Sequence, residues 1–216
     1  MATIISGAIA SIYLRVSKNK KNMKAIKILL IAVWGLAIQT STAQAQLFSL
    51  KSHKVTVNGT SSIHDWESTV EKIECKGSLE VANNMLAEIS DVVVTIPVKS
   101  IKSPKGKMMD HKTWEAFNYE KTPAIIFKLT GKKINPENRT LNAVGTLTMA
   151  GVTKTVDLDL AYKILNGGAV QVTGSKKLKM TDFKMDPPTA MMGTIKVGDE
   201  VEVFFDLVLI QNNNTL

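Results

Sequence analysis

The chain has 216 residues and a formal net charge of +8 at pH 7. Its first 45 residues hold six basic side chains and no acidic one, so the remainder carries only +2, and we expect no nucleic-acid partner. Cys75 is the only cysteine, which excludes an internal disulfide and leaves the core to stabilise the fold.

The N-terminal region has the three parts of a secretory signal peptide. Lys24 and Lys27 precede an apolar run at 28–38, and small and polar residues lead from it to an A-x-A site at 43–45. Eleven apolar residues are too few for the ~20 that a spanning helix needs, so we expect no integral membrane anchor. We predict a signal peptide over 1–45, with Met23 as an alternative translation start, and a periplasmic or secreted domain over 46–216.

Most of the mature chain alternates apolar and polar residues, as half-buried strands do. Asn58-Gly59, Asn135-Pro136, Gly151 and Asn166-Gly167 predict turns between these stretches, and Pro97 indicates an edge or a bulge. The predicted strands lie at 54–57, 63–70, 77–81, 89–101, 124–134, 141–149, 156–160, 162–165, 169–178 and 201–209, and a long loop covers 180–198.

One segment, 110–123, has the spacing of a short helix. Asp110 can cap its first turn, Trp114 and Phe117 lie three residues apart on one face, and Pro123 ends it. Such a short helix is not stable alone, so its aromatic face should rest on the strands as a lid over one end of the sheet or barrel.

About eight antiparallel strands with hairpin turns and one short helix predict an all-β, up-and-down barrel. Closure removes exposed strand edges, whereas a sandwich, the alternative architecture, keeps them. A barrel of about eight strands either fills itself with side chains or holds one small ligand.

The sequence offers little catalytic or metal-binding chemistry, and we predict a non-catalytic protein without a cofactor or metal. It contains no G-x-S-x-G nucleophile motif, and His53, His64 and His111 are not at metal-ligand spacing. Met108, Met109 and His111 could offer soft ligands to copper, so a periplasmic copper-binding protein is one alternative.

Two further residues have structural interpretations. Cys75 has no activating neighbour, so we expect it to be structural or to join two copies of the chain in a homodimer. His64 is predicted to be a hydrogen-bonded strand residue beside a packed Trp66.

Large apolar side chains gather near the predicted helix and the long loop. They could fill a solid core or line a flexible, methionine-rich cavity for a long apolar ligand, and the pattern alone favours the core. These residues are Trp114, Phe117, Met149, Met180, Phe183, Met185, Met191 and Met192.

Three stretches carry a resemblance to a known family: MDH at 109–111 through PAIIF at 123–127, GTLTMAGVTK at 145–154, and MTDFKM at 180–185 with GTIKVGDEV at 193–201. Together they resemble the YceI-like, polyisoprenoid-binding proteins, which have a lipocalin-like barrel. Four positions depart from the family pattern. Lys112, Ala150, Met180 and Lys184 stand where the family usually has Leu, His, Arg and Gly.

The resemblance implies an exported, non-catalytic barrel that holds a long-chain isoprenoid or other lipid, and it favours the cavity over the solid core. A copper-binding protein and a ligand-free structural or interaction barrel are the alternatives. The expected ligand-binding residues are Trp114, Phe117, Phe127, Met149, Met180, Phe183 and Met185.

Overall fold

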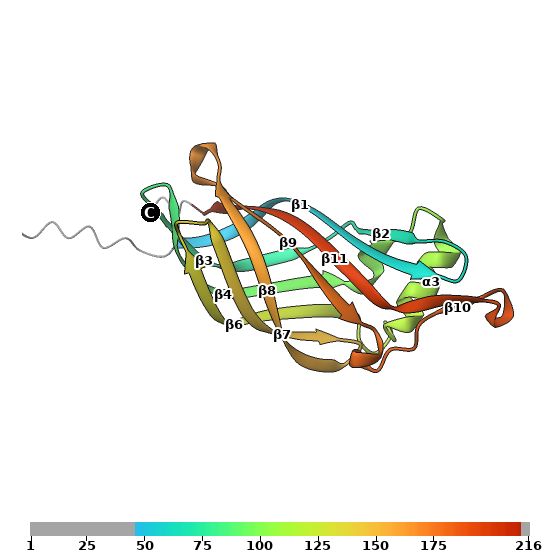
Figure 1. The fold of residues 1–216 in the computed structure, drawn as a ribbon. Coiled ribbons are helices and arrows are strands. Elements are labelled where there is room, and N and C mark those ends of the chain that lie inside the picture. The colour runs from blue at the N-terminus through green and yellow to red at the C-terminus, as the bar shows by residue number, and fades with distance from the viewer. Residues whose placement is uncertain (1–45, 213–216) are drawn as a thin grey trace, which may run out of the picture. The chain divides into compact units, whose positions relative to one another are not determined.

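The computed structural model describes residues 46–212, which form a closed antiparallel barrel (Figure 1). Within these residues eight strands form the wall, and the pairing of β11 with β1 completes the ring. In order around the ring they are β1 (Gln46–Ser61), β3 (Glu74–Ala82), β4 (Met85–Pro97), β6 (Ala124–Asn135), β7 (Thr140–Met149), β8 (Val152–Ile164), β9 (Val170–Lys179) and β11 (Ile195–Gln211). The predicted all-β, up-and-down barrel with one short helix is confirmed.

Short elements extend this ring. β2 (Trp66–Val70) pairs with β1, β5 (Ile101–Lys102) pairs with β2, and β10 (Thr189–Ala190) pairs with β11. The helical segments are η1 (Val98–Ser100), α3 (Lys107–Ala116), η2 (Asn166–Gly168), η3 (Thr181–Phe183) and η4 (Met191–Gly193). None of the helices described is long and apolar enough to cross a membrane.

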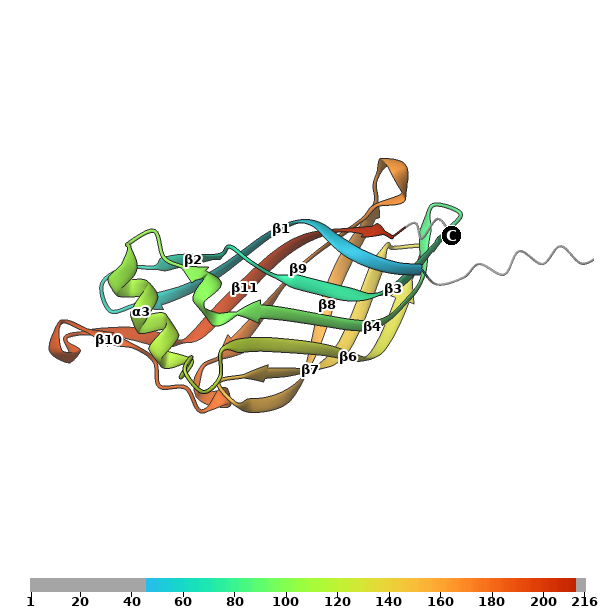
Figure 2. The same ribbon diagram turned by 180° about the vertical axis from the view of Figure 1, so that it is seen from behind.

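The two ends of the barrel differ. α3, β2 and β10 lie at one end, which we call the helix end, and the connection between β8 and β9 projects from the other, which we call the far end (Figures 1 and 2). Any ligand that enters between the strand ends therefore meets α3 and its neighbours at one end and hairpin turns at the other.

The pleat of the strands decides which side chains enter the barrel. In β8, Val156 and Leu160 are buried, whereas Thr155, Asp157 and Asp159 between and beside them are exposed. β7 and β11 alternate in the same way. The apolar faces predicted for these three strands are therefore the inner faces of the wall.

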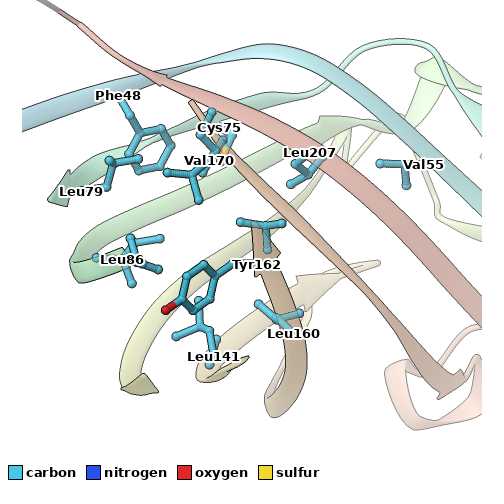
Figure 3. Packing of buried hydrophobic residues seen from close by; sticks show 14 of the residues in the cluster. Phe48, Val55, Cys75, Leu79, Leu86, Leu141, Leu160, Tyr162, Val170 and Leu207 are labelled. Atoms are coloured by element: carbon cyan, nitrogen blue, oxygen red, sulfur yellow. The ribbon is translucent and has the colours of Figure 1, made fainter. Parts of the chain in front are cut away.

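The buried side chains form two clusters. The larger cluster includes Phe48, Leu79, Leu86, Leu141 and Tyr162, which lie near one another in Figure 3. The smaller one, which we call the methionine cluster, consists of Met149, Met180, Phe183, Met185 and Val201. The core is therefore divided along the barrel, with methionine concentrated in one part of it.

Most of the predicted turns are confirmed. Asn135-Pro136 lies at the connection of β6 to β7, and Asn166-Gly167 joins β8 to β9. Ala150 and Gly151, both at positive φ (49° and 80°), join β7 to β8. Residues that tolerate a left-handed backbone, or that fix φ as proline does, make such turns recognisable in the sequence.

The predicted turn at Asn58-Gly59 is wrong, because both residues lie inside β1. Gly59 is paired with Trp66, and a Cβ on Gly59 would come within 2.3 Å of the indole ring. This glycine is needed for close approach of an aromatic ring and not for a turn. The chain reverses at 62–65 instead, so His64 is an exposed turn residue and not the predicted strand residue.

The helix is also displaced from its predicted position. Gly106 is the N-cap residue, at φ 91°, so Asp110 does not cap α3. The carboxylate of Asp110 is buried instead and pairs with the Lys102 ammonium at 3.3 Å. α3 ends at Ala116, well before Pro123, and a turn covers the residues between them.

Two smaller predictions differ in detail from the structure. Pro97, predicted to mark an edge or a bulge, is the last residue of β4 and pairs there only with Ala124 of β6, as at an edge, and a bulge lies earlier in the strand at Asp91, whose φ is 54°. The loop predicted at 180–198 is interrupted by η3, by the short β10 and by the start of β11 at Ile195.

Candidate functional site

The methionine cluster brings together four of the seven predicted ligand-binding residues. Met149 ends β7, and Met180, Phe183 and Met185 come from the segment around η3 that follows β9. Phe183 is the most deeply buried of them, with 1% of its surface exposed. Thioether side chains are flexible and polarisable, so they can adapt to ligands of irregular shape.

Phe117 and Trp66 border this cluster. Phe117 is the C-cap residue of α3 and packs against both clusters, which makes it the contact between the helix and the barrel interior. Trp66 packs against the methionine cluster, and its indole N–H donates to the Thr60 carbonyl at 2.9 Å. Trp66 is not among the predicted site residues, because its position opposite Gly59 depends on a strand pairing that the sequence pattern does not reveal.

Trp114 does not share the environment of Phe117, which corrects the prediction that both occupy one buried face. Its indole N–H donates to the Ile101 carbonyl at 3.1 Å, and the Lys102 ammonium lies 4.4 Å from the ring centroid. The ring of Tyr119 stands edge-on to it at 6.1 Å. Trp114 therefore attaches α3 to β5, and it belongs to neither buried cluster.

Phe127 lies against the inner wall outside the methionine cluster. A Cβ on Gly145 of the neighbouring β7 would come within 2.4 Å of its ring, so the ring occupies the space that a side chain at 145 would take. Two further cross-strand pairs repeat this arrangement: Phe48 with Gly77, and Phe205 with Gly174. Small residues opposite large ones allow aromatic rings to fit inside a narrow barrel.

Asp199 of β11 holds the η3 segment in place. Its carboxylate accepts the N–H of Thr181 at 2.8 Å and the Thr181 hydroxyl at 2.6 Å, and its carbonyl accepts the Met180 N–H at 3.0 Å. The hydrogen bond from the Thr181 side chain is the main reason why the pKa of Asp199 lies below its usual value. These bonds fix the segment that carries three methionine-cluster residues, and Asp199 was missing from the predicted site.

The wall between β8 and β9 is open near the helix end. Their pairing starts at Ile164 with Val170 and ends at Leu160 with Gly174, so residues 152–159 and 175–179 are not paired with each other. A groove of about 320 Å³ lies along this opening. Phe183 lines the groove and also belongs to the methionine cluster, so its ring separates the groove from the other cluster residues.

Two ion pairs border the groove. Lys176 lies 3.2 Å from the Asp157 carboxylate, and Lys154 lies 3.1 Å from that of Asp182. The hydrogen bond from Lys176 is the main cause of the lowered pKa of Asp157. Both pairs are largely solvent-exposed, so each contributes little to stability.

Several inward-facing side chains between buried neighbours keep accessible surface. Leu158 lies between Val156 and Leu160 on the inner face of β8, yet it is only partly buried, whereas both neighbours are buried. The same holds for Leu147 of β7, and the consecutive inner positions Val203 and Phe205 of β11 are both partly buried between buried Val201 and Leu207. Side chains thus cover the middle of these strands less completely than the positions on either side.

The remaining reactive groups are inert or exposed. Burial raises the pKa of the Cys75 thiol to about 12, so it is neutral at physiological pH and agrees with the structural alternative for this residue. Within residues 46–212, no group of three His, Cys, Asp or Glu side chains gathers at a possible metal site. Of the suggested copper ligands, Met108 is exposed and His111 lies 3.1 Å from the Glu115 carboxylate.

Comparison with known proteins agrees with this geometry. The YceI-like domain matches residues 36–209 of the chain. The chain belongs to the YceI-like domain family. A comparison with proteins of curated function finds no match.

Several solved structures have a similar fold. Burkholderia cenocepacia BcnA is 20% identical with a TM-score of 0.58, over 72% of this chain and 95% of that one. A polyisoprenoid binding domain from Saccharophagus degradans is 12% identical with a TM-score of 0.59, over 78% and 100%. A Campylobacter jejuni YCEI protein is 19% identical with a TM-score of 0.54, over 68% and 85%. These likenesses establish the YceI-like fold of the chain.

The stretches that carry the YceI-like resemblance meet around the methionine cluster. Met149 ends the strand of the second stretch, Met180 to Met185 form the first part of the third, and Val201 ends its second part. Phe117, from the first stretch, packs against them. The YceI-like motifs therefore build one region of the barrel, although they are far apart in the sequence.

Proposed function

We propose that this YceI-like protein binds a long apolar lipid, such as an isoprenoid, inside its barrel without transforming it. The observation that supports the proposal most strongly is the partial exposure of inward-facing side chains. Leu158 lies between buried Val156 and Leu160, and the adjacent inner positions Val203 and Phe205 lie together between buried Val201 and Leu207. In this proposal that accessible surface borders unfilled volume inside the barrel, and an apolar chain there would remove the surface from water. The Saccharophagus degradans domain of similar fold is named as polyisoprenoid binding, which supports the same ligand class.

The methionine cluster would form the adaptable end of this site. Phe117 and the η3 segment cover the helix end, and Phe183 lies between the cluster and the groove beside β8. In this proposal the ligand lies along the inner faces of β8 and β11 and reaches the methionine cluster. Phe127 lines the wall on the opposite part of the ring, and Trp114 contributes only by holding α3.

We also propose that the protein is exported and acts in the periplasm or outside the cell. The charge asymmetry and the A-x-A site of residues 1–45, which lie outside the described residues, support this proposal. The intact mass of the exported protein should correspond to a chain that begins at Gln46. A secreted product that still carries residues 28–38 would contradict a cleaved signal peptide.

Extraction of the purified mature protein, followed by mass spectrometry of the extract, tests lipid binding. We expect one lipid-sized species in roughly stoichiometric amount. An extract without lipid, together with copper in elemental analysis, would favour the copper-binding alternative through Met108, Met109 and His111. An extract with neither would favour a structural or interaction barrel.

A further inference from the structure

Exposed apolar side chains concentrate at the helix end. Of the large hydrophobic residues in 46–212 that are exposed, four lie in segments at this end: Ile63 (61% exposed), Met108 (75%), Met191 (73%) and Met192 (107%). They belong to three segments: the β1–β2 turn, the start of α3 and the tip of the β10–β11 hairpin. All three segments project at the helix end in both views (Figures 1 and 2).

The loops with Ile63 and with the tip methionines are connected by hydrogen bonds. The Ser62 N–H donates to the Lys196 carbonyl at 2.9 Å, and the Lys196 N–H donates to the Ser62 hydroxyl oxygen at 3.2 Å. These bonds attach the β1–β2 turn to the base of the β10–β11 hairpin. The two loops that carry Ile63 and the tip methionines are therefore joined at their bases.

The two methionines at the hairpin tip stabilise neither the turn nor the core. Met191 and Met192 have φ values of 51° and 55°, a left-handed conformation in which asparagine and glycine are far better tolerated. Both side chains are exposed and belong to neither buried cluster. Long apolar side chains in such a position are useful when they are buried in something outside the molecule.

The charge around these tips is positive. The three segments with their flanking residues, 62–65, 102–112 and 184–196, contain six lysines and three aspartates. Of the aspartates, Asp110 is buried and already paired with Lys102. The surface that presents the apolar tips is therefore complementary to an anionic one.

We propose that the helix end docks on a lipid bilayer with anionic headgroups, with Ile63, Met108, Met191 and Met192 inserted among the headgroups. Separate projecting tips surrounded by lysines fit the interfacial region of a membrane, where apolar insertion and attraction to anionic lipids add together. A protein partner would instead need a continuous, complementary patch of about 800 Å² on each side. Docking at this end would place the methionine cluster next to the membrane.

Sedimentation of delipidated protein with vesicles tests the proposal. We expect the wild type to bind anionic vesicles made of equal parts of phosphatidylcholine and phosphatidylglycerol. It should bind neutral vesicles of phosphatidylcholine alone much more weakly. Replacing both tip methionines (Met191→Ser with Met192→Ser) should weaken binding to the anionic vesicles about tenfold, because two apolar insertions are lost. Raising the salt concentration should weaken wild-type binding as well.

Leu47→Ser is the matched control, because Leu47 is 57% exposed but lies at the start of β1, at the far end. Its vesicle binding should stay within about twofold of wild type. Equal binding by all three proteins, or no binding by the wild type, would overturn the proposal. So would a concentration-dependent dimer that the tip substitutions abolish, since the tips would then serve self-association. The lipid content of the purified tip variant should match wild type, which separates docking from the proposed lipid binding inside the barrel.

Discussion

Asp199 and Thr181 come from different parts of the chain, and their two hydrogen bonds attach η3 to β11. Replacing Asp199 with Asn keeps one oxygen to accept the Thr181 N–H, reverses the direction of the hydrogen bond with the Thr181 hydroxyl, and removes the negative charge that strengthens both bonds. We expect faster amide hydrogen exchange over residues 180–185 in Asp199→Asn, and lower lipid retention. Asp159→Asn, which changes an exposed carboxylate on β8, is the control and should exchange like wild type. Unchanged exchange in Asp199→Asn would show that other contacts hold η3.

The pKa of Asp199 adds a pH dependence to the same contact. Because hydrogen bonds lower the pKa of this carboxyl from 3.8, the contact stabilises the fold above that value and is lost as the pH falls through the lowered pKa. The hydrogen exchange of residues 180–185 should therefore stay slow down to about pH 4 and increase below it, relative to that of the strands.

Cys75 should make the folded protein less stable as the pH rises in the alkaline range, whereas the Asp199 contact is lost as the pH falls. Its thiol titrates near 9.0 when unperturbed and near 12 in the folded protein, so between these values the unfolded chain binds fewer protons than the folded one. The thiol should therefore lower the free energy of unfolding by about 1 kcal/mol between pH 9 and pH 10 in wild type, and this part of the pH dependence should be missing in Cys75→Ala. Urea unfolding of both proteins between pH 9 and pH 10 measures this difference. Identical slopes would mean that the folded thiol ionises as easily as a free one.

Two glycines have roles in strand packing that the sequence pattern alone does not show. Gly59 next to Asn58 has the composition of a hairpin turn, and only the position of Trp66 across the strand pair explains it. Gly145 is required by the Phe127 ring in the same way. Close approach between strands is a long-range property, so local sequence pattern does not reveal it.

At the scale of elements, α3 makes two separable contacts. Phe117 packs against both buried clusters, whereas Trp114 packs on β5 and on Lys102. We expect Phe117→Ala to lower the free energy of unfolding by about 1 to 2 kcal/mol, because a partly buried ring loses fewer contacts than a core ring, and to reduce lipid retention. Trp114→Ala should retain lipid like wild type.

Urea unfolding of delipidated protein and lipid retained per mole measure both effects, since bound lipid would itself add stability. Leu141→Ala, at a fully buried site of the larger cluster, is the packing control and should cost about 2 to 5 kcal/mol without a direct effect on the ligand. A loss of similar size at Phe117, with unchanged lipid retention, would show that α3 is part of a solid core.

The strands were easier to predict than the helix for a physical reason. Alternation along β7, β8 and β11 follows directly from burial of one face, so the sequence contains it. α3 has no such strong pattern: within it only Asp110 is buried, and its cap is a glycine. Its position depends on the ion pair of Asp110 with Lys102 and on Trp114, contacts that the helical spacing alone does not specify.

For the whole molecule, the closed antiparallel barrel of about eight strands and four residues of the methionine cluster were predictable, because inner faces and chain order determine them. The incomplete pairing of β8 with β9 was not, since both strands keep regular patterns through the opening. The division of the interior into two clusters depends on how rings and glycines fit across strands, which becomes visible only in three dimensions.

The central claim is that unfilled volume beside Leu158 receives the lipid, and Leu158→Trp tests it most directly. Leu160→Trp, one inner position further along β8, is the matched control, because Leu160 is buried and Leu158 is not. We expect Leu158→Trp to retain at least about tenfold less lipid, while its delipidated form unfolds within about 1 kcal/mol of wild type. Leu160→Trp should be destabilised by about 1 to 3 kcal/mol through overpacking. Wild-type lipid content in Leu158→Trp, together with a loss of stability as large as that of Leu160→Trp, would contradict the account.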